Sequence, residues 1–349
     1  MRIEEYLTAE VDAGALPGAT FAFGDARRCF AGAVGWTDDT RSQATTTDLI
    51  YDLASMSKVM ATTSVAMRLW QEGFFDLDDP VQKWLPEASW PGVTVRMLLT
   101  HSSGLPAHER LDLLARDDAD AWGRLLAWPL AAKPDAQQTY SCLGFLILGR
   151  LLTRVLMGGK FDVATERERR DMFRVFVDMN ILRPLQMDAT GFCPKERFPL
   201  EAIAPTEGKS WGDVHDENAR FLGGIAGNAG LFGPVGDVAT FAQAFLRGGE
   251  GVIDRPTIDR FTARWSEGPE DSRALGWDTK SPIGSSAGSK FGPRSYGHTG
   301  FTGTSLWIDP EAGIFGVLLT NRVHPTRERE GIVRVRPAFY DLVFDALTG

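Results

Sequence analysis

The chain has 349 residues, 43% of them hydrophobic and 24% charged, a composition that excludes the disordered, collagen-like and membrane classes. Its length predicts about two lobes, because a single hydrophobic core stops growing near roughly 250–300 residues. The net charge of −9 gives no electrostatic support to a nucleic-acid or anionic-membrane partner. The longest apolar runs, residues 142–149 and 314–320, are shorter than the roughly 18–20 residues that span a bilayer.

The cysteines and the N-terminal residues indicate whether the protein is cytoplasmic or secreted. Cys29, Cys142 and Cys193 are odd in number and lie far apart without a CxxC spacing, so neither a disulfide framework nor a zinc ribbon is indicated. Residues 1–18 are acidic and amphipathic, and they lack the basic region and apolar core of a signal peptide. We therefore expect a cytoplasmic protein, with a secreted protein trimmed of its signal segment as the open alternative.

Hydrophobic periodicity predicts strands near both ends of the chain and helices between them. The predicted elements are, in chain order, a helix at 3–13, strands at 18–23 and 29–34, a helix at 55–72, strands at 274–279, 304–309 and 314–321, and a helix at 336–347. Between 73 and 265 the pattern is mostly helical and is broken by proline and glycine.

This order of elements predicts an α+β fold. The simplest assembly is one antiparallel sheet built from both chain ends and covered by the terminal helices, with a helical insertion as a second lobe. We expect one domain in which residues 1–75 and 266–349 form the α/β lobe and residues 76–265 the mainly helical lobe. A cleft between such lobes is a common ligand site.

Several chemical motifs are missing from the sequence. It contains no HExxH, no pair of histidines at helical i,i+4 spacing and no GxxxxGK[ST] loop, so we expect no metal and no cofactor. One GxSxG occurs at 284–288, but its flanks are neither a buried strand nor a helix, as a nucleophile elbow requires. We interpret it as a loop, with Ser286 as the less favoured candidate nucleophile.

The most informative spacing is Ser-x-x-Lys at Ser55 and Lys58. Ser55 lies at the start of the first strong helical period, where backbone N–H groups and the helix dipole stabilise negative charge. Lys58 is one turn further on the same face. A lysine partly buried near a helix N-terminus is expected to have a lowered pKa and could help to deprotonate the hydroxyl of Ser55. The structural alternative is an N-cap serine followed by a surface lysine.

Two further segments favour the catalytic interpretation. Tyr140 comes just before an apolar helix start, where its phenol could reach a serine and a lysine; the alternative is a core tyrosine. His298, Thr299 and Gly300 precede a strand, and the flanking glycines let the backbone approach a ligand closely. The next residue, Phe301, could donate its backbone N–H to an oxyanion together with that of Ser55. The alternative for His-Thr-Gly is a turn.

These elements, in this order, resemble the penicillin-recognising serine hydrolases: class C β-lactamases, D-alanyl-D-alanine carboxypeptidases and β-lactamase-like esterases. The segment DLASMSK at 52–58 resembles the group's nucleophile segment, and LLTHSSGL at 98–105 and YSCLGFLILG at 140–149 resemble two further stretches. The pair Gly-Trp at 276–277 and the glycine-rich segment at 223–232 add to the likeness, which covers most of the chain. The resemblance implies the β-lactamase/transpeptidase-like fold.

The resemblance also implies roles. Ser55 would form the acyl-enzyme, Lys58 and Tyr140 would act as a coupled base, and the N–H groups of Ser55 and Phe301 would form the oxyanion hole. The substrate-binding residues would be Cys142, His298, Thr299 and Gly300. We assign His101, Ser102 and His215 to structure, because the segments that carry them more often support such a cleft than take part in chemistry.

Two positions depart from the group's pattern. Cys142 replaces the asparagine that in β-lactam- and peptide-processing members holds the acyl-amide oxygen, and a thiol is a weak hydrogen-bonding group. His298 replaces the lysine of many relatives, which weakens the fixed positive charge that would hold a substrate carboxylate.

Both departures favour an ester. The sequence therefore predicts that the substrate is a small-molecule ester, amide or lactam. Among these it favours the ester, so we expect a carboxylic-ester hydrolase. The alternatives are a D-amino-acid-specific peptidase or weak β-lactamase, and a penicillin-sensing or ligand-binding relative without turnover. The oligomeric state stays open.

Overall fold

The computed structural model describes residues 2–208, 210–267 and 272–349. Its main sheet has eight antiparallel strands in the order β2-β1-β10-β9-β8-β7-β6-β5. The strands are β1 (Gly18–Asp25), β2 (Cys29–Gly35), β5 (Ser266–Glu267), β6 (Ser272–Arg273), β7 (Asp278–Thr279), β8 (Tyr296–Thr299), β9 (Ser305–Asp309) and β10 (Ile314–Thr320). A second, two-stranded sheet pairs β3 (Tyr51–Asp52) with β4 (Phe232–Gly233). The predicted α+β architecture with an antiparallel sheet built from both chain ends is confirmed.

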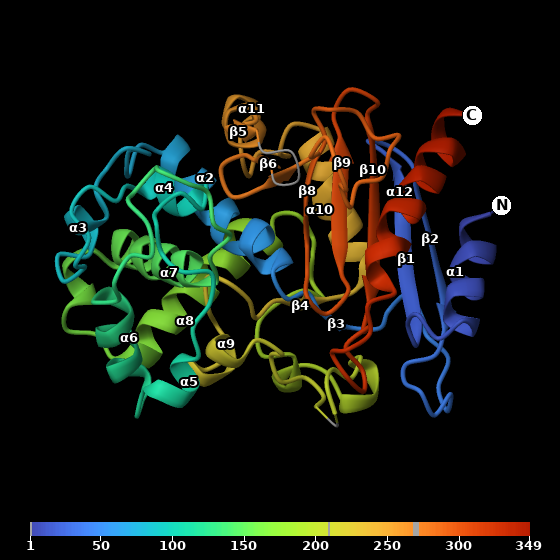
Figure 1. Cartoon of the computed structure of the whole chain (residues 1–349), viewed down its shortest axis with the longest axis horizontal. Helices are drawn as coiled ribbons and strands as arrows, with labels where there is room; N and C mark the ends of the chain where they lie inside the picture. Colours follow the sequence, from blue (N-terminus) through green and yellow to red (C-terminus); the bar gives the residue numbers. More distant parts are fainter. Residues whose placement is uncertain (1, 209, 268–271) are drawn as a thin grey trace.

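The helices lie mostly between β3 and β5 in the chain (Figure 1). The α-helices are α1 (Ile3–Asp12), α2 (Ser64–Gln71), α3 (Val81–Trp84), α4 (Val95–Leu99), α5 (Leu111–Leu114), α6 (Asp118–Leu126), α7 (Cys142–Met157), α8 (Glu166–Val177), α9 (Glu217–Phe221), α10 (Val235–Leu246), α11 (Arg255–Thr262) and α12 (Ile332–Thr348). Wider π-helical turns cover Lys58–Thr63 and Asp178–Leu182, and short 3₁₀ turns cover Gly158–Phe161, Pro194–Glu196 and Leu200–Ala202.

The main sheet is covered on both faces. Helices α1 and α12 pack together on one face, and α10 packs on the other face against β1 and β10 (Figure 1). Side chains alternate along the strands to suit this arrangement. Phe21 and Leu318 join the core beneath α1 and α12, whereas their neighbours Ala22 and Val317 join the larger core on the side of α10.

The position of α10 bears on the predicted division into lobes. The boundary expected at residue 265 would place α10 in the helical lobe, yet this helix is part of the cover of the sheet. The α/β part of the fold therefore takes up a segment that the sequence pattern assigns to the insertion. The physical reason is that an open sheet must bury both of its apolar faces, and the terminal helices cover only one.

Helix α7 is the central helix of the helical region. Together with the turn after it, it is the one helix of the described residues whose length and apolarity suffice, on those criteria, to cross a membrane. Here it packs against α3, α4, α6 and α8, and the side chains of residues 143–149 are buried among them. Its apolar run is thus explained by its place in the core.

The structure differs from the predicted strands in two places. The segment predicted as one strand at 274–279 is a hairpin turn with β6 before it and β7 at its end, because Gly276 has a φ of +85° and Ala274 N–H donates to the Trp277 carbonyl at 2.9 Å. Strand β8 has no apolar alternation and was not predicted. It forms because it is hydrogen-bonded on both sides, by β7 and β9.

Candidate active site

Ser55 is placed by a tight turn between β3 and the helical segment that starts at Met56. Ala54, directly before it, has a φ of +46°, a conformation that L-residues rarely adopt. The buried Asp52 carboxylate stabilises this turn, since it accepts the N–H groups of Ala54 at 2.8 Å and His215 at 2.7 Å. The strained turn leaves the Ser55 hydroxyl at the positive end of a helix, as the sequence predicts.

Residues from distant parts of the chain hold the nucleophile turn. Thr302 donates to the Asp52 carbonyl at 2.8 Å, and Thr304 donates to the Leu53 carbonyl at 3.1 Å. On the other side, Leu53 N–H donates to the Leu231 carbonyl at 3.0 Å. The turn is therefore fixed both to the β8–β9 hairpin and to the segment that enters β4.

Lys58 is fully buried and lies beside Ser55. Its Nζ donates to Ser55 Oγ at 2.9 Å and to the Asn228 carbonyl at 2.9 Å, and it lies 3.6 Å from Cys142 Sγ. Burial on its own would lower the pKa of Lys58, but the charges of Cys142 and Tyr140 favour the ammonium, so the pKa is raised. The lowered pKa expected from the helix N-terminus is thus wrong for the resting site.

Tyr140 lies beside Lys58 and Ser55. Lys58 Nζ lies 5.1 Å from the centroid of the Tyr140 ring, and Tyr140 and Ser55 line the same cavity. Burial raises the pKa of Tyr140 by more than Lys58 lowers it. Ser55 can pass a proton to the Lys58–Tyr140 pair only after that pair has lost one proton. Their proximity is what the predicted coupled base requires.

His101 packs against Tyr140. The two rings are 4.6 Å apart between centroids, and His101 Nδ1 accepts the Ser141 N–H at 3.0 Å. Ser141 in turn caps α7, because its Oγ accepts the Gly144 N–H at 3.0 Å. In this structure His101 is thus a packing residue that fixes the entry of α7 and the ring of Tyr140.

His298 also lies against Tyr140, with ring centroids 5.9 Å apart. Its Nδ1–H donates to the Thr299 carbonyl at 2.8 Å. The pKa of His298 lies well below its usual value because burial and the positive charges of Lys58 and Arg273 disfavour the imidazolium. At neutral pH the ring is therefore uncharged.

Arg273 was missed by the sequence analysis. It forms an ion pair with Asp278, and its guanidinium carbon lies 5.0 Å from the centroid of the Tyr140 ring. Arginine at the end of a two-residue strand carries no signal in the sequence. The hairpin of β6 and β7 brings it to the site.

In the part of the chain that the structure describes, the backbone leaves both N–H groups of the predicted oxyanion hole without an acceptor. Among the described residues, neither the Ser55 N–H nor the Phe301 N–H has a hydrogen-bond acceptor in the protein. Gly300 is needed for this arrangement, because a Cβ there would lie 2.1 Å from Thr304 Oγ1 and 2.7 Å from the Leu53 carbonyl oxygen. The two N–H groups are thus available to a developing oxyanion.

These residues open into a cavity of about 900 Å³. All eight predicted site residues except the buried Lys58 line it, and Lys58 reaches it through Ser55. Other lining residues come from the helical region, from the loop before α9 and from the N-terminal end of α12: His108, His215, Asp216, Glu217, Ile332, Val333.

His215, which we assigned to structure, and Ser286, the less favoured candidate nucleophile, take different positions. His215 does line the cavity, but its side chain stacks on the Phe301 ring at 5.6 Å and its Nε2 lies 3.3 Å from Glu207. Ser286 lies in a loop, as predicted, and its Oγ accepts the Trp307 indole N–H at 3.1 Å. It does not line the cavity.

The β-lactamase family model matches residues 3–338, and the chain belongs to this family. A curated relative from Escherichia coli K12, named a putative D-alanyl-D-alanine carboxypeptidase, is 30% identical over 320 residues, which cover 80% of this chain and 70% of the relative. The resemblance stated from the sequence motifs is confirmed. The fold and the family together define a serine hydrolase of the β-lactamase and penicillin-binding-protein group.

Solved structures share the fold over nearly the whole chain. A class C β-lactamase has a TM-score of 0.76 at 17% identity, with 99% of this chain and 96% of that chain covered. EstCE1, described as a hydrolase with promiscuous acyltransferase activity, has a TM-score of 0.73 at 21% identity, with 98% and 97% covered. At these identities the likeness shows the fold, and the predicted roles of the site residues stay predictions.

Proposed function

We propose that the protein hydrolyses carboxylic esters through an acyl-enzyme on Ser55. The observation that carries this proposal is Cys142, whose Sγ occupies the wall beside Ser55 and Lys58. A substrate amide needs a strong hydrogen-bonding partner for its polar atoms, and a thiol is a weak donor and a weak acceptor. The acyl group of a simple ester has no amide to be hydrogen-bonded at this position.

The charges around Ser55 support the same substrate class. His298 is neutral, and the positive charge of Arg273 is balanced by Asp278. The rim of the cavity also carries exposed apolar side chains, of which Val333 and Phe301 are 73% and 50% exposed. A neutral ester with an apolar group suits this cavity better than a substrate with a free carboxylate.

The proposed reaction uses the network described above. Ser55 Oγ attacks the ester carbonyl as its proton passes to the Lys58–Tyr140 pair. The N–H groups of Ser55 and Phe301 bind the oxyanion of the tetrahedral intermediate. Tyr140 returns the proton to the leaving alcohol, and a water molecule activated by the same pair then releases the acid and regenerates Ser55.

A carboxypeptidase reaction is the second candidate. Arg273 lies beside Tyr140 in the cavity, where its guanidinium could hold the C-terminal carboxylate of a peptide if Asp278 shared it. The name of the curated relative favours this activity for that relative. The machinery on Ser55 would be the same, and only the recognition would differ.

The test is hydrolysis of a short-chain p-nitrophenyl ester, a D-alanyl-D-alanine peptide and a chromogenic β-lactam by the wild type and by Ser55→Ala. We expect ester turnover by the wild type that falls to background in the variant, with the peptide and the β-lactam cleaved more slowly. Preferred cleavage of the peptide would replace the ester proposal by the carboxypeptidase. Covalent labelling by a penicillin without turnover of any substrate would favour the sensor.

A further inference from the structure

Three side chains of metal-binding types meet at one wall of the cavity. A ring nitrogen of His108, Sγ of Cys142 and a carboxylate oxygen of Asp216 all lie within 4.8 Å of one another. Ligand atoms around tetrahedral Zn²⁺ are roughly 3.3–3.8 Å apart, so each side chain needs to move by only about an ångström. We propose that these residues bind Zn²⁺ and that the bound ion inhibits the hydrolase.

The backbone holds the three ligands in place before any ion arrives. Cys142 N–H donates to the carbonyl of Ala107, the residue before His108, at 2.9 Å. Asp216 is fixed because its Oδ1 caps α9 through the Ala219 N–H at 2.8 Å. Oδ2 takes no part in this cap, so it is the oxygen available to a metal.

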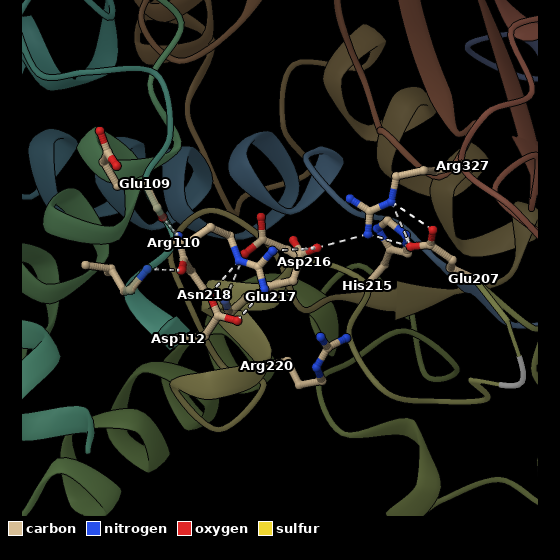
Figure 2. Close-up of polar contacts among 12 residues, drawn as sticks. Glu109, Arg110, Asp112, Glu207, His215, Asp216, Glu217, Asn218, Arg220 and Arg327 are labelled. Atoms are coloured by element: carbon tan, nitrogen blue, oxygen red, sulfur yellow. Dashed lines mark hydrogen bonds and ion pairs between the residues drawn. The ribbon is translucent and has the colours of Figure 1, made fainter. Parts of the chain in front are cut away.

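Asn218 joins the two segments that carry His108 and Asp216. Its Oδ1 accepts the Leu111 N–H at 2.9 Å, and its Nδ2 donates to the Glu109 carbonyl at 2.7 Å. Figure 2 shows Asn218 between these segments, with Asp216 and Glu217 next to it in the chain. Because these hydrogen bonds already fix the segments that carry the three ligands, binding an ion costs little conformational entropy.

The donor set matches Zn²⁺ in softness and charge. One imidazole, one thiolate and one carboxylate are ligands that zinc accepts, and the two anionic groups balance its charge. Coordination releases the thiol proton of Cys142 to solvent. Since His108 is exposed and the cluster lines the cavity, an ion can enter from solvent, and its fourth position is open to water.

The inhibition follows from the place of the ion in the cavity. Ser55, Cys142, His108 and Asp216 all line this cavity, and Cys142 Sγ and Ser55 Oγ both lie within hydrogen-bonding reach of Lys58 Nζ, at 3.6 and 2.9 Å. An ion on this sulfur, with its bound water, therefore occupies space beside Ser55 that the substrate needs. This part of the inference rests on the proposed function, whereas the binding of the ion does not.

The binding test uses Co²⁺ as a spectroscopic probe in a Cys29→Ser/Cys193→Ser background, so that Cys142 is the only thiol. We expect one Co²⁺ per chain, displaced by Zn²⁺, with a thiolate-to-metal charge-transfer band that Cys142→Ser abolishes. His108→Ala and Asp216→Asn should each weaken binding by at least about tenfold, because removing a ligand costs no less than removing its supporting partner. Asp216→Asn keeps the cap on α9. An unchanged band in these variants would overturn the site.

Ser55→Ala in the same background serves as the control that separates metal binding from hydrolysis. It should bind Co²⁺ as the parent does, although it lacks turnover. In the active parent, Zn²⁺ should inhibit ester hydrolysis and a chelator should restore it, and His108→Ala should need more Zn²⁺ for the same inhibition. Binding at the site with no loss of activity would overturn the inhibition and leave the metal site standing.

Discussion

In the proposed function, Cys142 affects both the choice of substrate and the base formed by Lys58 and Tyr140. It begins α7, directly after the capping Ser141, so its side chain is held towards Lys58 and its backbone towards Ala107. Burial on its own would raise the pKa of the Cys142 thiol, but the nearby Lys58 ammonium and His108 outweigh it, so the pKa is lowered. We therefore expect a single substitution here to change the contact with Lys58 and, if the proposed function holds, a contact with the substrate.

We predict that Cys142→Asn raises amide or β-lactam hydrolysis relative to ester hydrolysis. Asparagine offers a donor and an acceptor where the thiol offers weak ones, and a hydrogen bond made in the transition state is worth about 1 kcal/mol or roughly fivefold in kcat/KM. The measurement is the ratio of the two kcat/KM values in the same preparation. Cys29→Asn, at an exposed position outside the cavity, is the matched control and should leave the ratio unchanged. An unchanged ratio in Cys142→Asn would remove this residue from substrate selection.

At the scale of elements, the site depends on the contact between α7 and the loop before β4. The carbonyls of Gly227 and Asn228 accept hydrogen bonds from Thr62 and Lys58, and so set the position of the base. The loop approaches α7 so closely that a Cβ on Gly227 would lie 2.1 Å from the Phe145 carbonyl oxygen. The glycine is required by backbone on both sides of the contact.

Gly227→Ala should therefore push the loop away from α7. We expect a loss of about 1–3 kcal/mol in the free energy of unfolding, the range for overpacked sites, and a lower kcat because the Asn228 carbonyl moves away from Lys58. Chemical denaturation and ester kinetics measure the two effects. Gly123→Ala in α6, where nothing lies within 4 Å of the new Cβ, should instead stabilise the protein by about 0.5–1 kcal/mol at unchanged kcat. Equal behaviour of the two variants would contradict this account.

At the scale of the whole molecule, buried titratable groups around the site make stability depend on pH. Burial, the largest cause, keeps the pKa values of His101 and His298 well below 6.5, so the unfolded chain binds more protons than the folded one as the pH falls below about 6.5. Asp52 acts in the opposite direction. Burial raises its pKa to about 6, so between about pH 6 and 4 the folded state binds more protons.

These three groups predict a net loss of stability at acid pH. Below about pH 6 the unfolded state binds two more protons at the histidines, and the folded state binds one more at Asp52. The difference of one proton lowers the free energy of unfolding by about 1.4 kcal/mol per pH unit. Urea denaturation at pH 7.5, 6 and 5 measures the slope. His298→Gln should flatten it by about the same amount. Asp52→Asn should make it steeper, and the same slope in all three proteins would refute the assignment.

The features that could be predicted from sequence are those with local signals. Strands β1, β2, β9 and β10 carry apolar runs next to turn residues, and Ser55 and Lys58 share one face of a helix through their spacing alone. Strand β8 carries no such pattern, because pairing on both sides rather than its own composition makes it a strand.

The electrostatics of the site depend on partners that are distant in the chain. The pKa of Lys58 is raised by Cys142 and Tyr140, whose approach is a result of the fold. The same holds for Arg273, which reaches Tyr140 only through the β6–β7 hairpin, and for the meeting of His108 with Asp216. Motif spacing predicts which residues are neighbours along one helix or strand. It could not predict these contacts, because they join different elements.

The order of strands has a consequence for how the protein is made. Strand β1 is complete within the first 25 residues, but its neighbour β10 ends at Thr320, and the anchors of the Ser55 turn include Thr302 and Thr304. During synthesis β1 therefore gains this partner, and the Ser55 turn gains these anchors, only after the chain as far as Thr320 has left the ribosome. We expect a nascent chain to lack hydrolase activity until then, and to expose an unpaired edge of β1 that a chaperone would have to cover.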